Sequence, residues 1–311
     1  MRDPTIIEQQ SFSAEKDVEF MKNNIKSDKS KILEMVIMKS IEQRKQLEDC
    51  YKSTMKKDLQ VVLKGSTKGL GDFLIGIFMS ILEYDCYVLK QAVKGFGTDE
   101  PAITDILAFR SNAEIKEIKE YYRQMYKKDL EKDLRGDLSG DHLKLALAII
   151  EAARPAPPSE ITDELISADV ETLVNAKKLV DADFFNILTT RSYRQLRATF
   201  NQYEKRSNKD LLEVLKAEVN SSTFELLQAV VGCVFNGRQH TLARRVHTAL
   251  TSKKENQIIR LFVSRSTVDL EQVISYYKKV YDQRLEDVVD QNVSNSDLKM
   301  VLQLMLKGNV Y

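Results

Sequence analysis

A short loop in the first third of the chain combines glycines with acidic residues. The stretch VKGFGTDE, residues 93–100, contains Gly95 and Gly97, followed closely by Asp99 and Glu100. A glycine loop before a helix can cradle a phosphate, because backbone N–H groups at a helix N-terminus attract anions. This loop has no third glycine and no Lys-Ser/Thr pair after it, so it matches neither dinucleotide-binding nor P-loop patterns. Its two carboxylates would repel a phosphate, and they favour a cation instead.

A hard cation such as Ca²⁺ suits these residue types. It prefers carbonyl, carboxylate and water oxygens as ligands. Because glycine tolerates positive φ, successive carbonyls can turn inward, and the loop can offer those of Val93, Gly95 and Gly97. The loop has no bidentate carboxylate of its own. A second glycine-containing turn, RGDLSGD, holds Asp137, but taken alone this pattern indicates only a turn between helices.

The elements that carry these turns are predicted to be helices. In AEIKEIKEYYRQMYKKDL, apolar residues recur at helical spacing and place Ile115, Ile118, Tyr122 and Met125 on one face. No segment sustains the alternation typical of a strand, so we predict an all-α protein. The 311 residues, 43% hydrophobic and 30% charged, are typical of a soluble globular chain with one large domain or two to three smaller ones.

The chain also repeats itself. DILAFRS, NILTTRS and RLFVSRS end at Ser111, Ser192 and Ser266, and EMVIMKS is a fainter copy that ends at Ser40. The basic residues before these serines are 71, 81 and 74 positions apart (110−39, 191−110, 265−191), which predicts four units. We expect these arginines to cap carbonyls or to pair with buried carboxylates, rather than to bind a ligand. The proline-rich segment RPAPPSE, residues 154–160, indicates a connector between two halves.

The loop and the second turn together resemble the annexin family. Its signature joins a K-G-x-G-T-D-E loop to an acidic residue in an acid-Leu-Ser/Thr-Gly turn. Here Asp137 lies 42 positions after Gly95 (137−95), and its turn reads DLSG. The resemblance extends over nearly the whole chain. It implies four repeats of about five helices each, arranged as a slightly curved disc with calcium loops on the convex face. It also implies calcium-dependent binding to acidic phospholipid membranes.

The resemblance implies a main calcium site, with ligands transferred residue by residue. These ligands are the carbonyls of Val93, Gly95 and Gly97 and the carboxylate of Asp137. The alternative from the residues alone is a glycine hinge whose acids cap the next helix.

The resemblance also implies two further roles in the same loop. A minor calcium site would use the carbonyl of Thr98 and the carboxylate of Glu100. Phe96, between the two glycines, would contact the membrane, and its alternative is packing onto the following helix.

The other three repeats depart from the pattern. The first has KNNIKSDKSKI in place of the glycine loop and Ser66 at the acidic position. The third keeps Glu218, 27 positions after its arginine like Asp137 (218−191, 137−110), but its loop NAKKLVDAD has no glycine. The fourth has ALTSKKENQ and Asn292. We therefore expect one strong site, with Glu218 as a weak residual candidate. This pattern is similar to the divergent alpha-giardin branch, and it leaves a calcium-insensitive scaffold associated with cytoskeleton and membrane as the alternative function.

The repeat register predicts the domain organisation. The expected segments are an N-terminal tail at 1–13, a degenerate first repeat at 14–83, a second repeat with an intact calcium site at 84–153, a Pro-rich connector at 154–163, and degenerate third and fourth repeats at 164–236 and 237–311.

Composition excludes other classes of function. A net charge of +1 selects no nucleic acid. Three scattered cysteines fit no disulfide framework and favour reduced cytosolic thiols. No apolar signal core or spanning segment is present, so we expect a cytoplasmic protein, peripheral on membranes. The three histidines are too scattered for a catalytic site, His142 is expected at the surface, and we expect no enzyme. The expected partners are acidic phospholipid, a cytoskeletal protein in the alternative reading, and other copies of the chain on membranes.

Overall fold

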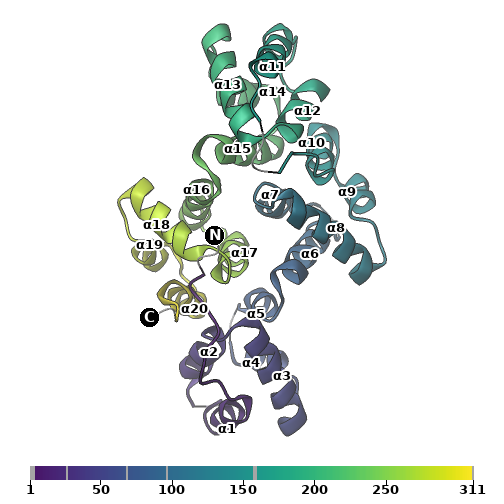
Figure 1. Cartoon of the computed structure of the whole chain (residues 1–311). Coiled ribbons are helices and arrows are strands. Elements are labelled where there is room, and N and C mark those ends of the chain that lie inside the picture. The colour runs from purple at the N-terminus through teal and green to yellow at the C-terminus, as the bar shows by residue number, and fades with distance from the viewer. Residues whose placement is uncertain (1–3, 26, 68, 96, 157–159, 310–311) are drawn as a thin grey trace. The chain divides into compact units, whose positions relative to one another are not determined.

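The structure is a computed structural model, and it describes residues 4–25, 27–67, 69–95, 97–156 and 160–309. Within these residues the chain forms twenty helices and no strand (Figure 1). The helices follow one another in four sets of five, which confirms the predicted all-α fold of five-helix repeats. The chain divides into two compact units: Met1–Tyr84 with Leu242–Tyr311, and Asp85–Thr241.

The first unit contains the helices of the first and fourth repeats. They are α1 (Ala14–Asn24), α2 (Lys29–Ile37), α3 (Ile41–Met55), α4 (Leu59–Ser66), α5 (Gly71–Ile77), α17 (Glu255–Ser266), α18 (Leu270–Tyr281), α19 (Leu285–Asn292) and α20 (Ser296–Lys307). α5 packs against α17, and α2 packs against α20. α5 and α17 approach each other closely at Gly76, because a Cβ on this residue would lie 2.8 Å from Val263 in α17. The same Cβ would lie 2.6 Å from Tyr84, at the start of the next helix.

The second unit contains the second and third repeats. Its helices are α7 (Glu100–Leu107), α8 (Asn112–Tyr126), α9 (Leu130–Asp137), α10 (Gly140–Ile150), α11 (Asp163–Asn175), α12 (Ala182–Thr190), α13 (Tyr193–Ser207), α14 (Leu211–Glu218) and α15 (Ser221–Asn236). α6 (Ile81–Ala92) and α16 (Arg238–Thr251) cross the boundary between the units. α7 packs against α15, and α10 packs against α12, so each unit joins two repeats through the same pair of helices.

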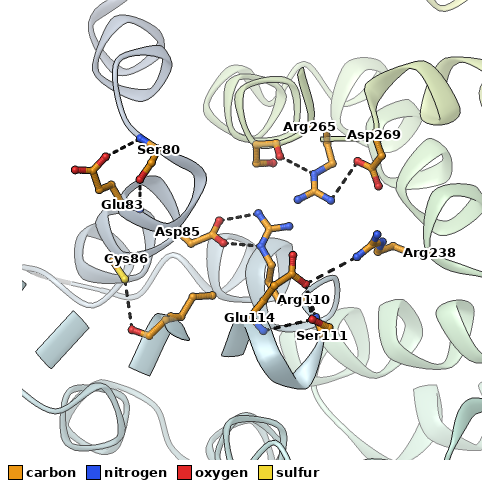
Figure 2. Close-up of polar contacts among 12 residues, drawn as sticks. Ser80, Glu83, Asp85, Cys86, Arg110, Ser111, Glu114, Arg238, Arg265 and Asp269 are labelled. Atoms are coloured by element: carbon orange, nitrogen blue, oxygen red, sulfur yellow. Dashed lines mark hydrogen bonds and ion pairs between the residues drawn. The ribbon is translucent and has the colours of Figure 1, made fainter. Parts of the chain in front are cut away.

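The serine of the repeated motif starts the third helix of each of the first three repeats. The side chains of Ser40, Ser111 and Ser192 are N-caps of α3, α8 and α13. Ser111 Oγ accepts from the backbone N–H of Glu114 at 3.3 Å, and the Glu114 carboxylate accepts from the N–H of Ser111 at 2.7 Å (Figure 2). This reciprocal capping satisfies N–H groups that a helix end leaves without partners.

The arginine of the motif pairs with a buried carboxylate in the second and third repeats. Arg110 binds Asp85 through two nitrogens, with Nη2 to Oδ1 at 2.8 Å (Figure 2). Burial raises the pKa of the Asp85 carboxyl, and Arg110 opposes that rise. Arg191 binds Asp169 in the same way, at 2.8 and 2.9 Å. The expected structural role of these arginines is confirmed.

The first and fourth repeats vary this ion pair. Lys39 takes the arginine's place and lies 3.0 Å from a carboxylate oxygen of Asp17. Arg265 lies 3.3 Å from Asp269, only four residues later, and both side chains are almost fully buried (Figure 2). The position is therefore ion-paired in all four repeats, by different partners.

Two general features concern the hydrophobicity of the helices and the state of the cysteines. Among the described residues, none of the helices has both the length and the apolar character that crossing a bilayer requires. All three cysteines have free thiols. Burial raises the pKa of Cys86 and of Cys233 to about 12, so both remain protonated at neutral pH.

Candidate cation site in the second repeat

The glycine loop connects α6 to α7, and a hydrogen bond closes its base. The N–H of Asp99 donates to the carbonyl of Ala92 at 3.0 Å. The Asp99 carboxylate then accepts from the N–H of Ala102 at 3.0 Å and caps α7. Asp99, one of the two acids in the loop sequence, therefore caps the N-terminus of α7. This is the alternative role for the loop acids that the sequence allowed.

Both glycines adopt conformations that other residues avoid. Gly95 has φ +102° and Gly97 has φ +90°. No atom lies within 4 Å of the place where a Cβ would stand at either residue, so conformation and not space requires glycine. Both glycines are exposed, whereas Val93 and Thr98 on either side of them are partly buried. Phe96 lies outside the described residues, and its membrane contact stays a prediction.

Asp137 lies beside this loop, although it is far along the chain. It is the last residue of α9. The hydroxyl of Thr98 donates to Oδ2 of Asp137 at 2.6 Å, and its oxygen is 3.3 Å from the Asp137 carbonyl. The structure thus brings together the loop and the acid that the resemblance, with its spacing of 42 residues, had linked. The hydroxyl of Thr98 joins the loop to Asp137, whereas the resemblance implied a role only for the Thr98 carbonyl.

Glu100 points to a neighbouring helix of the same unit. Its Oε2 accepts from the hydroxyl of Ser222, in α15, at 2.7 Å. His142 is close enough for Glu100 to affect its protonation: burial lowers the pKa of His142, while Glu100 and Glu225 oppose the change. The expectation of a surface histidine was wrong, because His142 is inside α10 and only 3% exposed. Neither ring nitrogen has a hydrogen-bond partner among the described residues.

A second polar cluster links α6, α8 and α9, the helices next to the loop. The ammonium of Lys90, in α6, and the hydroxyl of Tyr122, in α8, both donate to Oδ2 of Asp133, each at 2.7 Å. Burial and the Asp133 carboxylate raise the pKa of Tyr122. Since Asp133 is one turn before Asp137 in α9, this cluster holds the end of α9 in place against α6 and α8.

The equivalent acid of the third repeat has a different use. Glu218 ends α14. Its Oε1 accepts from the N–H of Leu179 at 3.0 Å, and its Oε2 accepts from the N–H of Val180 at 2.8 Å. The loop therefore presents two donors to the carboxylate, whereas a cation site must present oxygens. Leu179 and Val180 are themselves buried, which holds the loop in this orientation.

The first and fourth repeats have neutral side chains at the acidic position. The hydroxyl of Ser66 donates to the carbonyl of Leu63 at 2.8 Å, and the amide of Asn292 donates to the carbonyl of Val288 at 2.9 Å. Both groups are satisfied within their own helices. In the described part of the chain, no three His, Cys, Asp or Glu side chains lie together as a metal-binding group, so a cation at the second-repeat loop would depend mainly on backbone carbonyls.

Comparisons with known proteins agree with this architecture. A sequence model of the family described as Annexin matches residues 84–149, 169–230 and 242–304. Annexin A1 of Homo sapiens is 31% identical over 290 residues, which cover 91% of this chain and 83% of that protein. The structure of chicken annexin V superposes with a TM-score of 0.88 at 27% identity, covering 98% of this chain and 99% of that one.

A giardin shares the fold at lower identity. The calcium-bound structure of alpha-14 giardin superposes with a TM-score of 0.75 at 18% identity, covering 94% of this chain and 98% of that one. Members of the matching family are generally non-enzymatic proteins that bind Ca²⁺ and, through it, phospholipid membranes. The three matched segments and the similarity to annexin A1 along most of the chain lead to one conclusion: this chain belongs to the annexin family.

Proposed function

We propose that this protein binds acidic phospholipid membranes peripherally and in a calcium-dependent way, through the second-repeat loop. The observation that carries the proposal is the hydrogen bond of 2.6 Å between Thr98 and Asp137. It holds a carboxylate beside a loop whose two glycines have positive φ. Carbonyl and carboxylate oxygens at one place are the ligands that Ca²⁺ prefers.

The proposed ligands are the carbonyls of Val93, Gly95 and Gly97 and both carboxylate oxygens of Asp137. A carboxylate oxygen has two lone pairs, so Oδ2 can keep the Thr98 hydroxyl and still contact the ion. Lipid phosphate and water would complete the shell. One carboxylate among neutral carbonyls compensates little of the ion's charge, so we expect a Kd on the order of 10⁻⁴ to 10⁻³ M without lipid.

Lipid and calcium then strengthen each other's binding. Because the ion touches both partners, each must raise the affinity of the other by the same factor. A single site gives little avidity, so we propose that copies of the chain associate on the membrane and supply it. The minor site at Thr98 and Glu100 is a weaker candidate, since the Glu100 carboxylate already accepts the Ser222 hydroxyl. The membrane contact would be at the cytoplasmic face.

Sedimentation with vesicles tests the proposal. The full-length protein should pellet with phosphatidylserine vesicles in millimolar calcium and stay largely in solution with a chelator. Asp137→Ala should lose most of the calcium-dependent fraction while keeping its helical content, because Asp137 ends a helix at the surface. Equal pelleting with calcium and chelator in the wild-type protein would instead favour the calcium-insensitive scaffold, and pull-down with cytoskeletal proteins would then be the next measurement.

A further inference from the structure

The three repeats without a glycine loop all have lysines in the segment that replaces it. In the first repeat two of these lysines, Lys29 and Lys31, are paired within the protein, and Lys22 is exposed. The ammonium of Lys29 lies 2.7 Å from Asp297 at the start of α20, and that of Lys31 lies 2.8 Å from Asp28. Two lysines of the first-repeat loop therefore already have a carboxylate partner.

The fourth-repeat loop is different, because its lysines are free. Lys253 and Lys254 are both exposed, and neither ammonium bonds to a described residue. Lys254 precedes α17 at the capping position, and its side chain makes no capping hydrogen bond. The other three repeats have aspartate at this position: Asp28, Asp99 and Asp181. The charge at one structural position is thus reversed in this repeat alone.

The fourth repeat has also lost the negative charge at the position of the acid. Asn292 stands where the second repeat has Asp137, so the turn beside the loop is neutral. Within residues 251–257 the two lysines face one acid, Glu255, so the loop is positive without any ion. In the second repeat the positive charge between protein and lipid must come from calcium. In the fourth repeat the loop itself supplies it.

The third repeat shows that free lysines are not a general property of these loops. Lys178 lies 3.0 Å from a carboxylate oxygen of Asp141, in the second unit. Asp141 also contacts Lys144 at 3.1 Å, and the hydrogen bonds from the two lysines lower its pKa. Only Lys177 of that loop is exposed without a bond to a described residue. Two adjacent lysines available to a partner therefore distinguish the fourth-repeat loop from the other two degenerate loops.

We propose that Lys253 and Lys254 bind the phosphate groups of an anionic lipid surface without calcium. The inference rests on the proposed function, since it assumes that the loop ends of the repeats face the membrane. A lysine near an anionic membrane strengthens binding about fivefold, so the pair should contribute about 25-fold. Salt weakens such contacts, because exposed charges are screened within about 8 Å at physiological ionic strength.

The test uses the full-length protein in chelator, with vesicles of phosphatidylcholine alone or mixed with phosphatidylserine. The first variant is Lys253→Gln with Lys254→Gln. The matched control is Lys56→Gln with Lys57→Gln, which removes the same charge from the same unit. Lys56 and Lys253 both have φ +54° and both precede a second lysine. The control pair lies between α3 and α4, whereas Lys253 and Lys254 lie between α16 and α17.

We expect weak, salt-sensitive binding of the wild-type protein to phosphatidylserine vesicles in chelator. The Lys253/Lys254 variant should bind about 25-fold more weakly, and the Lys56/Lys57 variant should bind like the wild type. The inference is overturned if the wild-type protein ignores phosphatidylserine in chelator, or if both double variants lose the same amount.

Asp137→Ala separates this inference from the proposed function. It should keep the binding seen in chelator and lose the increase that calcium causes. If the increase persists in Asp137→Ala, the calcium proposal fails while the lysine contact stands. If the binding in chelator is absent but the increase depends on Asp137, the reverse holds.

Discussion

The hydroxyl of Thr98 offers the sharpest test of how the cation site is organised. Replacing Thr98 by Val keeps the shape of the side chain and removes the donor to Asp137, which lies 2.6 Å away. A hydrogen bond to a charged group contributes about 1.5–3 kcal/mol. The contact is partly exposed, so we take the lower value.

Without this bond the ion itself would have to order the loop against Asp137. The lost free energy of about 1.5 kcal/mol then appears as a calcium affinity about tenfold weaker. Thr98→Ser, which keeps the hydroxyl, should restore most of the affinity. Thr172→Val is the control, because that hydroxyl donates only to the Ala168 carbonyl within α11. Calorimetric titration with calcium measures all three variants, and a Thr98→Val protein with wild-type affinity would refute the role of this bond.

Three further predictions concern other residues. Glu218→Gln should leave calcium binding unchanged and lower the free energy of unfolding by about 1–2 kcal/mol, because a neutral amide holds the two backbone N–H groups less well; a urea titration showing no loss, or a lost calcium signal, would contradict this. The pKa of His142 is lower in the folded state than in the unfolded state, so the folded protein takes up this proton only at a lower pH. The stability that is present above pH 6.5 is therefore lost as the pH falls through the folded pKa. His142→Leu should therefore show a smaller fall in Tm than the wild type between about pH 7.5 and about pH 5.5, and equal falls would refute the assignment. Phe96→Ser should weaken vesicle binding about tenfold or more without changing calcium binding in solution, because burying a phenyl ring contributes roughly 1.5–3 kcal/mol; equal vesicle affinities would rule out insertion of the ring.

Local signals in the sequence were sufficient to predict the helices and their repetition. The pattern of a serine followed three residues later by Glu or Gln, at Ser40 with Gln43 and at Ser111 with Glu114, is a readable capping box. In the sequence these serines are visible first as the end of a repeated motif. The structure shows that they begin the next helix.

The partners of the motif's basic residues could not be predicted in the same way. Arg110 pairs with an acid 25 positions earlier (110−85), whereas Arg191 pairs with one 22 positions earlier (191−169). The connection between the first two helices differs by only one residue (93–99 against 176–181), so the rest of the difference comes from where the acid and the arginine lie relative to their helices. In the fourth repeat the position 25 residues before Arg265 is His240 (265−240), and the arginine pairs with Asp269 instead.

At the site, the family resemblance predicted which segments meet but not which groups face each other. The family resemblance associated loop and acid, through the separation of Gly95 and Asp137 in its signature. That the Thr98 hydroxyl joins them depends on a side-chain rotamer, which the sequence does not show. That Glu218 faces two N–H groups depends on the orientation of the peptides at Leu179 and Val180. The burial of His142 depends on how α10 packs within its unit, and its position beside Asp141 gave a misleading signal for the surface.

Diffraction from crystals grown with millimolar calcium would show whether the second-repeat loop binds the ion. We expect one strong density peak in the second repeat, bounded by the carbonyls of Val93, Gly95 and Gly97 and by both carboxylate oxygens of Asp137, and no ion beside Glu218. A second-repeat loop without an ion at that calcium concentration, or a strongest peak beside Glu218, would contradict it.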